Sequence, residues 1–254
     1  MTDGFIEQLI AARACRGRAS PPSATQALTP ADAYAIQDRL RDALVKGGER
    51  VVGWKAGFTN KASQAAFDAS EPVTGFLLAS GVFPGGAEIP MARFTNLAVE
   101  AEVAFVMRED LAGPGITAPR ALLAVEGAVP ALELIDMRYQ GKAIGTDVVA
   151  DGVYANAIVL GAPLSAVAGI DLALEGLVYE LNGAIAATNT AAEVMGSPVN
   201  SLAWMANQLG ARGLGLRAGD IVMSGSVSLL LRPRAGDVVR ATFTRLGSVA
   251  ARFV

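Results

Sequence analysis

Three glutamates lie where two strand-like segments would bring their carboxylates together. Glu100 and Glu102 are two residues apart in the run VEAEV, and Glu133 lies in the alternating run PALELID. Side chains at i and i+2 of a strand project to the same face, so the first two carboxylates would point to one place. Like charges there repel unless a cation neutralises them or one carboxyl keeps its proton. The pattern predicts a site for Mg²⁺ or Mn²⁺, and the alternative is a solvated acidic strand face.

The chain of 254 residues contains no histidine and one cysteine. The absence of histidine excludes the Ser/His/Asp and Cys/His arrangements, which need an imidazole. Cys15 has no partner for an internal disulfide or for a metal-ligand spacing. An enzyme made from this chain is therefore expected to depend on carboxylates and a metal ion.

Two further segments carry polar side chains beside apolar runs. Lys55 lies in the run GWKAG, whose glycines allow close approach of another backbone. A lysine inside an apolar strand needs a partner such as the acidic cluster, and the alternative is a surface lysine lying over Trp54. Ser226 ends the run SGS, which either presents hydroxyls and amides to a carboxylate or forms a bulge or a tight turn.

Helical patterns dominate the first 48 residues. Apolar spacing predicts a helix over 4–15, and a connector rich in Pro, Ser and Thr follows over 16–28. Thr29 and Pro30 then form a good helix start, and Gly47-Gly48 stops that helix. We expect a helical N-terminal section over 1–48.

From Val51 onward the chain consists of short apolar runs separated by Gly and Pro. Most are of strand length and rich in β-branched residues, and 197–209 is the one long stretch with a helical pattern. A regular alternation of strands and helices is absent, which argues against a doubly wound sheet. We therefore expect a single α+β domain over 1–254, in which a β-rich metal-binding body over 49–254 packs against the helical section.

Composition limits the possible partners. The chain is 52% hydrophobic and 18% charged, which excludes a disordered protein and favours apolar subunit contacts in a homo-oligomer. A net charge of −3 without a basic block argues against nucleic-acid binding, and GLGLRAG at 213–219 does not match the dinucleotide pattern GxGxxG. Acidic residues near the N-terminus argue against a signal peptide, and no uncharged run reaches the length of a membrane helix. A cytoplasmic protein without membrane contact is expected.

Nine segments in sequence order resemble the 2-keto-4-pentenoate hydratase / 4-oxalocrotonate decarboxylase group of the fumarylacetoacetate hydrolase superfamily. They are DAYAIQ, GERVVGWKAGFTNKA, EPVTGFL, VEAEVAFV, PALELIDMRY, VVADG, SPVNSLAWMANQL, LRAGDIVMSGS and GSVAARFV. The resemblance implies a mixed β-roll body of the fumarylacetoacetate hydrolase C-terminal type. It also implies a Mg²⁺ or Mn²⁺ site with the ligands Glu100, Glu102 and Glu133. By the same resemblance Lys55 is the active-site lysine, and Ser226 lies near the substrate.

Two positions depart from the hydratase pattern. Val73 stands where many hydratases have an acid, and Tyr154 stands where a serine is usual. We expect the Tyr154 ring at the mouth of the metal pocket, where it shapes the space around the distal end of the substrate and donates a hydrogen bond. The alternative is a ring buried in the core with its hydroxyl bonded to backbone.

The resemblance implies a metal-dependent lyase acting on a small 2-oxo or 2-hydroxy-dienoic acid. Our leading interpretation is a hydratase that adds water to a 2-hydroxy-2,4-dienoate, the tautomer of a 2-keto-4-enoate, to give a 4-hydroxy-2-oxo acid in the catabolism of aromatic compounds. Within the family the alternative is a 2-oxo-3-enedioate (4-oxalocrotonate) decarboxylase. An alternative of another class is a catalytically silent relative that binds small acids or supports a partner enzyme. Hydrolysis of a C–C bond by the superfamily's His/Glu pair is not expected, because the chain has no histidine.

Overall fold

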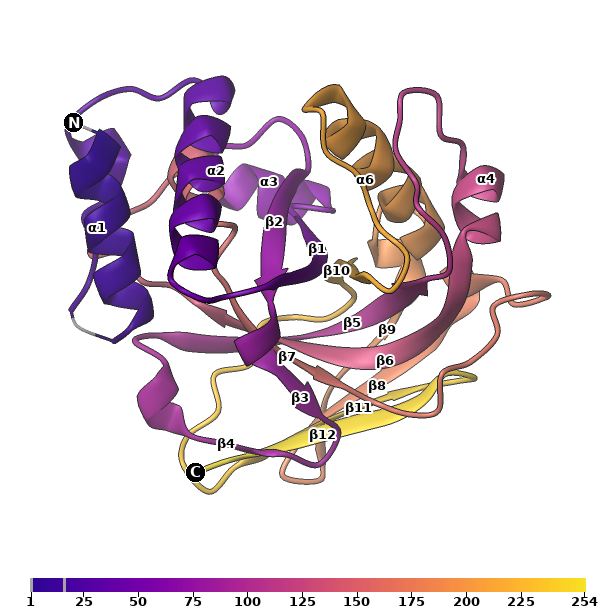
Figure 1. Ribbon diagram of the computed structural model, residues 1–254. Helices are drawn as coiled ribbons and strands as arrows, with labels where there is room; N and C mark the ends of the chain where they lie inside the picture. The colour runs from indigo at the N-terminus through magenta and orange to yellow at the C-terminus, as the bar shows by residue number, and fades with distance from the viewer. Residues whose placement is uncertain (1, 16) are drawn as a thin grey trace.

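Two mixed β-sheets and a layer of helices make up the computed structural model, which describes residues 2–15 and 17–254, with side chains from residue 4 onward (Figure 1). The first sheet has the strand order β2-β1-β10-β5-β6-β7-β3. Its strands are β1 Val51–Gly57, β2 Val73–Leu78, β3 Val82–Pro84, β5 Leu97–Met107, β6 Val125–Asp136, β7 Ala155–Leu160 and β10 Ile221–Ser226. The second sheet has the order β4-β12-β11-β8-β9, with β4 Glu88–Ile89, β8 Gly176–Leu181, β9 Ala184–Thr190, β11 Val238–Phe243 and β12 Gly247–Phe253.

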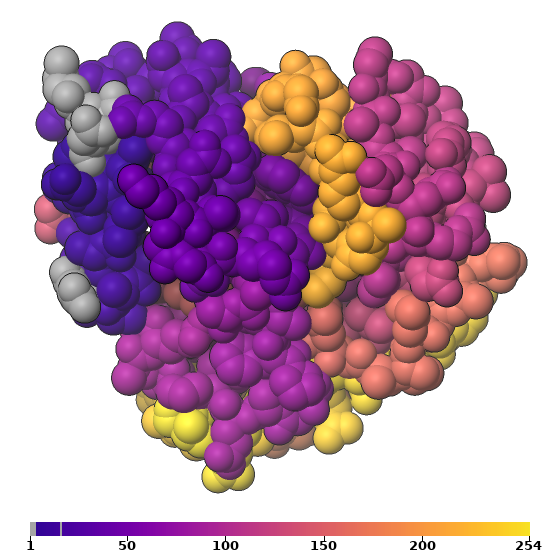
Figure 2. Space-filling view, viewed as in Figure 1, coloured from indigo at the N-terminus to yellow at the C-terminus, as the bar shows by residue number. Residues whose placement is uncertain are grey.

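The helices gather on the side of the molecule opposite β8, β11 and β12 (Figure 1). They are α1 Thr2–Arg13, α2 Pro30–Lys46, α3 Lys61–Ala66, α4 Ala118–Leu123, α5 Gly145–Ala150 and α6 Pro198–Ala211. In the space-filling view, α2 (violet) and α6 (orange) form one continuous surface (Figure 2). An ion pair of 2.7 Å joins Arg212, at the C-terminal end of α6, to Asp38 in the middle of α2. Within the part of the chain that the structure describes, no helix combines the length and the apolar character that a bilayer span requires.

Helix α2 starts as its sequence predicts. The Thr29 hydroxyl accepts a hydrogen bond from the Asp32 amide, and the Asp32 carboxylate accepts one from the Thr29 amide. This capping box satisfies two amides that a helix N-terminus would otherwise leave without partners. Pro30 occupies the first turn, where its missing N–H costs nothing. The other two predicted helices are also present, with α1 beginning and ending two residues earlier than the spacing predicts.

Strands β5 and β6 form the centre of the molecule. They pair antiparallel over their whole length, and nearly all of their side chains are buried. One face of β6 contacts β11 and β12 of the second sheet, so both faces of the pair are covered by protein. This explains why the two runs are apolar almost throughout and why a charged side chain within them is costly without a partner.

Several elements were not predicted. Helices α3, α4 and α5 have six residues each, too short for a helical period to show in the sequence. Strand β9 has the composition AIAATNT and is largely exposed, so it lacks the apolar alternation of a half-buried strand. It pairs with β8 through a tight turn at Asn182-Gly183, both with positive φ, as a two-residue hairpin connection requires. The predicted α+β class is confirmed. Short helices α3, α4 and α5 do separate strands, but the strands on either side of each pair antiparallel and not in a doubly wound arrangement.

Candidate metal centre

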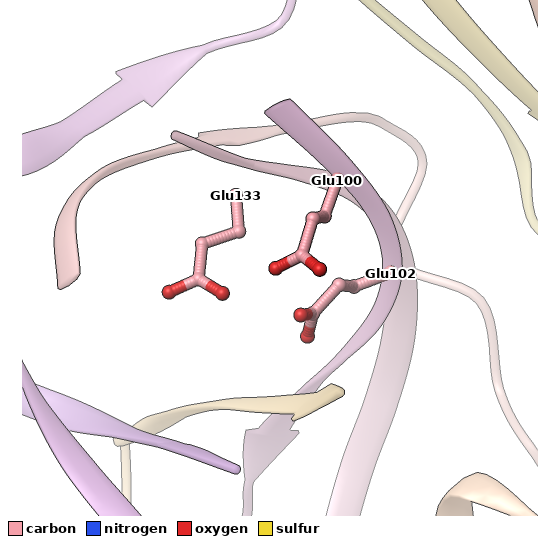
Figure 3. A group of neighbouring side chains, drawn as sticks. All are labelled: Glu100, Glu102 and Glu133. Carbon is pink, nitrogen blue, oxygen red and sulfur yellow. The ribbon is translucent and has the colours of Figure 1, made fainter. Parts of the chain in front are cut away.

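The register between β5 and β6 brings the three glutamates to one place. Glu100 lies directly opposite Glu133, and Glu102 follows two residues later on the same face of β5. Each residue offers a carboxylate oxygen that lies within 4.8 Å of those of the other two. Figure 3 shows the three carboxyl groups converging on one space between the strands. They do not form a solvated face, because Glu102 and Glu133 are fully buried and only Glu100 is partly exposed.

The electrostatics of this cluster call for a cation. Burial, with a further contribution from Glu133, raises the pKa of Glu102 well above its ordinary value. Burial also raises the pKa of Glu100 to about 7, while Lys55 and Ser226 act in the opposite direction. One oxygen of Glu102 accepts the Gly225 amide at 2.8 Å, but its other oxygen and Oε1 of Glu133 have no hydrogen-bond partner. A divalent ion would ligate such oxygens and neutralise their repulsion, so the residues present fit Mg²⁺ or Mn²⁺.

Lys55 reaches the cluster from β1, from which β5 is separated by β10. Its Nζ lies 2.8 Å from Oε2 of Glu133 and donates to the carbonyl of Val153 at 3.4 Å. Burial by itself would lower the pKa of Lys55, but the carboxylates of the cluster outweigh burial and raise it. Lys55 is therefore a buried ammonium group held against the acids, not a surface lysine lying over Trp54.

The glycines around Lys55 permit close backbone approach, as predicted. A Cβ at Gly53 would lie 1.8 Å from the carbonyl oxygen of Ile221 on the neighbouring strand, and one at Gly57 would lie 2.5 Å from Cγ1 of Val153. Any larger residue at either position would push β1 away from the elements that contact Lys55.

The run SGS forms a β-bulge. The pairing of β10 with β5 shifts register between Met223 and Ser226, and Gly225 has a φ of 115°. The bulge aims the Gly225 amide at Glu102. The Ser226 hydroxyl donates to the carbonyl of Ser228 at 2.8 Å and lies close enough to Glu100 to lower its pKa. A bulge, one of the two predicted conformations, thus also supplies a polar wall of the site.

A cavity of about 360 Å³ opens beside the carboxylates. Lys55, Glu100 and Ser226 line its polar end. Most of the remaining wall is apolar, formed by Phe58, Ala62, Ala66, Phe67, Ile135, Met137, Val148, Val153, Leu229 and Leu230. Thr59, Asn60, Ser63, Tyr154 and Ser228 add uncharged polar groups. Among the described residues that line the cavity, Lys55 is the only cation, and it already contacts Glu133.

Tyr154 lies in the wall of this cavity. Its ring packs edge-on against Phe67 and Tyr139, with ring centroids 6.4 and 6.0 Å away. Burial raises the pKa of its hydroxyl, and Asp151 and Asp147 add to the effect, so the phenol stays protonated. The ring is 5% exposed, but no backbone group of the described chain forms a hydrogen bond with its hydroxyl. This geometry supports the pocket position over the alternative of a backbone-bonded core tyrosine.

Two other residues from the sequence pattern lie outside the site. Asp136 is fully buried but turns away from the three glutamates, where its carboxylate accepts the amides of Thr95 and Asn96. Val73 is buried on β2 and is not among the described residues that line the cavity.

The apolar walls of the cavity were not predicted. Phe58 and Phe67 flank helix α3, and Leu229 and Leu230 follow β10 in an irregular segment with 49% and 39% exposure. In the sequence these residues have the types and spacing of ordinary core or loop positions. Only the folded arrangement shows that they face the carboxylates.

Comparisons with known proteins agree on the family. Residues 50–254 match the family model for the fumarylacetoacetate (FAA) hydrolase C-terminal domain. The chain is 34% identical over 228 residues to 4-oxalocrotonate decarboxylase of Pseudomonas putida, covering 89% of this chain and 86% of that protein. It is 35% identical over 235 residues to 2-oxo-hept-4-ene-1,7-dioate hydratase of Escherichia coli, covering 89% and 88%.

A solved structure has nearly the same fold over the whole chain. This is 4-oxalocrotonate decarboxylase from Pseudomonas putida G7, complexed with magnesium and adipate, with a TM-score of 0.95 and 29% identity over 100% of this chain and 97% of that one. A more distant structure, fumarylpyruvate hydrolase from Pseudomonas aeruginosa, has a TM-score of 0.62 and 16% identity over 81% of this chain and 89% of that chain, and it shares the fold alone. The chain belongs to the fumarylacetoacetate hydrolase family.

Proposed function

We propose that this protein is a divalent-metal-dependent hydratase that converts a 2-hydroxy-2,4-dienoate into a 4-hydroxy-2-oxo acid. The observation that carries the proposal is the convergence of Glu100, Glu102 and Glu133 beside the buried ammonium of Lys55, at the end of a cavity. The three carboxylates would hold Mg²⁺ or Mn²⁺. Relatives that are 34–37% identical include 2-hydroxyhexa-2,4-dienoate and 2-hydroxypent-2,4-dienoate hydratases, which supports this choice of reaction.

The residues of the chain have separate tasks in this reaction. A bound divalent ion supplies Lewis-acid stabilisation of the negative charge that develops on the C2 oxygen of the substrate. Lys55 holds a proton at Nζ within reach of the substrate, and it delivers that proton to the carbon chain or anchors the C1 carboxylate. Stabilisation of the developing charge by such an ammonium group is worth on the order of 3 kcal/mol. The Ser226 hydroxyl lies beside the partly exposed carboxyl of Glu100 and favours its charged form, and the apolar walls exclude bulk water from the conjugated chain.

The distal end of the cavity favours a substrate with an uncharged tail. A second carboxylate placed there would lose its hydration and meet phenyl, methyl and leucyl groups, with no cation of the described lining available to pair with it. The Tyr154 hydroxyl, with Asn60 and Ser63, offers hydrogen bonds but no charge. An uncharged tail of a few carbons would instead bury apolar surface against Phe58 and Phe67, which favours the hydratase over an enzyme for dicarboxylates.

A 2-oxo-3-enedioate decarboxylase is the second candidate. It is favoured by the structural match to 4-oxalocrotonate decarboxylase, which extends over the entire chain. Loss of the distal carboxylate would send electrons through the conjugated chain to the same C2 oxygen, so the same carboxylates and Lys55 would serve. The silent alternative has less support, because a non-catalytic protein has no physical need to keep three like charges converging in its interior.

The proposal extends to the organisation of the protein. The whole of 1–254 would act as one catalytic domain in the cytoplasm, as a homo-oligomer. Exposed apolar side chains on and beside the β8–β9 hairpin support an interface, since Leu174, Val178 and Ile185 are 67%, 37% and 66% exposed.

An ultraviolet assay of the purified protein tests the reaction. It uses Mg²⁺, Mn²⁺ or excess chelator, with 2-hydroxypenta-2,4-dienoate and 2-oxohex-3-enedioate offered separately. We expect metal-dependent loss of the dienoate absorbance and a higher kcat/KM for the monocarboxylate. Release of carbon dioxide from the dicarboxylate at the higher kcat/KM would assign the protein as a decarboxylase. Failure to consume either acid with either metal would refute the proposed function.

A further inference from the structure

A strained turn forms one wall of the cavity. Gly152, Val153 and Tyr154 follow one another with φ angles of 74°, 59° and 57°. Val153 is β-branched, and such residues adopt left-handed backbone only when the surrounding structure imposes it, at a cost of about 1–3 kcal/mol. The turn supplies the carbonyl that accepts from Lys55 and the ring of Tyr154. Its position therefore determines two features of the site.

Two arginines hold the backbone on both sides of this turn. Arg13 donates to the carbonyls of Asp151 at 2.5 Å and of Ala155 at 3.0 Å. Arg138 donates to the same Ala155 carbonyl at 2.8 Å and to that of Tyr154 at 3.4 Å. A guanidinium presents five donors in a rigid fork, which suits it to fixing several carbonyls at once.

The Asp151 carboxylate joins the two guanidinium groups. Its Oδ2 lies 2.7 Å from Arg138 and its Oδ1 lies 3.5 Å from Arg13. With Asp136, which lies 3.5 Å from Arg138, the cluster contains two positive and two negative side chains and so needs no outside counter-charge. Burial, and then Arg138, lower the pKa of Arg13 to about 10, so Arg13 remains charged at neutral pH.

Glycines on two neighbouring strands leave room for the turn. A Cβ at Gly75 would lie 2.4 Å from the carbonyl oxygen of Gly152, and a Cβ at Gly57 would meet Val153. The turn is thus in contact with two arginines and with two glycine-bearing strands, β1 and β2. These contacts restrict the backbone of the turn to one position. A carbonyl that positions a reactive ammonium group needs such a restriction.

Arg13 comes from α1, which lies outside the 50–254 segment matched by the family model. We propose that Arg13 is a positioning residue of the active site, which acts with Arg138 and Asp151 through the turn 152–154 to place Lys55 and Tyr154. The N-terminal helix is then part of the catalytic apparatus. This inference rests on the proposed function for its kinetic test alone. The contact between Arg13 and the turn can be tested without turnover.

Arg13→Ala, Arg13→Lys and the control Arg18→Ala form the test set. Arg18 is an exposed arginine five residues away in the same section of the chain. Hydrogen exchange followed by mass spectrometry reports on the turn without any substrate. In Arg13→Ala we expect exchange in the peptide over 150–156 to become about tenfold faster or more, with the peptide over 97–107 and the Arg18→Ala protein unchanged. Unchanged exchange over 150–156 in a folded Arg13→Ala protein would overturn the link.

Kinetics test the positioning role itself. We expect kcat of Arg13→Ala to fall by about tenfold to a hundredfold with KM within about twofold, because misplacement of a reacting group acts on the chemical step. Millimolar guanidinium should restore part of the activity, since Arg13 lines surface hollows that remain accessible after truncation. Rescue of kcat at a guanidinium concentration that leaves the thermal midpoint of Arg13→Ala unchanged indicates positioning, whereas a merely structural role predicts that kcat recovers only together with the thermal midpoint.

The remaining outcomes are also decisive. If Arg13→Ala does not fold, Arg13→Lys replaces it, and a kcat within twofold of the parent would overturn the proposal because lysine lacks the fork. Faster exchange over 150–156 with unchanged kcat would overturn the positioning role. A parent protein that turns over neither acid would refute the proposed function, while the exchange result would still decide whether Arg13 holds the turn.

Discussion

Replacing Glu102 by glutamine separates the energy of metal binding from the energy of burying like charges. Glutamine has almost the same shape, and its side-chain oxygen can still accept the Gly225 amide that Glu102 accepts at 2.8 Å. The substitution therefore removes one charge and one strong ligand while leaving the bulge of β10 in place. Its effects on the metal-free and metal-bound proteins should have opposite signs.

The expected magnitude follows from the spacing of the charges. At an effective dielectric constant of about 20, a divalent ion about 4 Å from the centre of a carboxylate charge gains roughly 8 kcal/mol. The same charge repels Glu133, and for oxygens no more than 4.8 Å apart this repulsion is roughly 3.5 kcal/mol or more. This repulsion is present with and without the ion and cancels from the binding free energy. The lost attraction of roughly 8 kcal/mol therefore decides the effect, and the amide oxygen recovers part of it as a weaker ligand. We therefore expect Mn²⁺ to bind Glu102→Gln at least about a hundredfold more weakly, or about 2.7 kcal/mol.

Two measurements on the same samples check this reasoning. Titration with Mn²⁺, followed by electron paramagnetic resonance, gives the dissociation constant. Thermal unfolding in chelator should show Glu102→Gln to be at least as stable as the parent, because a buried like charge is gone. With Mn²⁺ at a hundred times the parent's dissociation constant, the parent should gain about 2.7 kcal/mol of stability and the variant almost none.

Glu126→Gln is the matched control, since Glu126 lies on β6 with Glu133 but is exposed. It should leave both measurements unchanged. Mn²⁺ binding by Glu102→Gln within fivefold of the parent would refute the assignment of this carboxylate as a ligand. A large loss of stability in chelator would show that Glu102 stabilises the metal-free fold, contrary to the electrostatic argument.

Three further predictions concern the lysine, the tyrosine and the assembly. Lys55→Met should lower kcat by about a hundredfold or more, because on the order of 3 kcal/mol of transition-state stabilisation is lost. The same variant should bind Mn²⁺ at least as tightly as the parent, because a neighbouring positive charge is gone. Tyr154→Phe and Tyr154→Ser should change the ratio of kcat/KM between acids with and without a distal carboxylate, with little change in the thermal midpoint. Sedimentation at micromolar protein should show a homo-oligomer with contacts burying more than about 1,000 Å².

Each of the three has a result that contradicts it. A folded Lys55→Met protein with kcat within fivefold of the parent would remove Lys55 from the mechanism. Its control is Lys142→Met, which changes a lysine outside the described lining of the cavity. Loss of stability in both tyrosine variants with the parent's substrate ratio would make Tyr154 structural. A single monomeric species in sedimentation would exclude the oligomer, and an Ile185→Asp variant that leaves an observed oligomer intact would move the interface away from β8 and β9.

The local sequence pattern predicted the parts of this site that depend on strand geometry, and it could not predict those that depend on contacts between distant segments. The i, i+2 spacing placed Glu100 and Glu102 on one face, because strand geometry is local. Glu133 lies opposite Glu100 through the pairing of β5 with β6, which their alternation only suggests. The contact of Lys55 with Glu133 depends on the strand order β1-β10-β5-β6, which no local pattern contains. The apolar surroundings of Lys55 predicted the acidic cluster as one possible partner, and the resemblance to a family implied only that Lys55 is the active-site lysine.

The parts that were not predicted share a physical origin. Arg13 lies near the end of the helix predicted over 4–15, where nothing marks it as special, and its contacts lie 138 and 142 residues away in the chain. The left-handed backbone of Val153 and Tyr154 was not predicted, because surrounding groups impose it and the residues' own preferences oppose it. Helices of six residues carry too few turns to show a period. Interactions of this kind become visible only when tertiary structure is known.

The unequal burial of the three glutamates sets an order of events. Glu102 and Glu133 have no contact with solvent, and Glu100 is the one carboxylate of the three that lines the cavity. An ion held by the three glutamates would therefore enter past Glu100, through the space proposed for the substrate. A bound substrate closes that passage behind the ion. Metal would then bind before the substrate and leave after it, so a saturating substrate analogue should slow exchange of the ion with a chelator in solution.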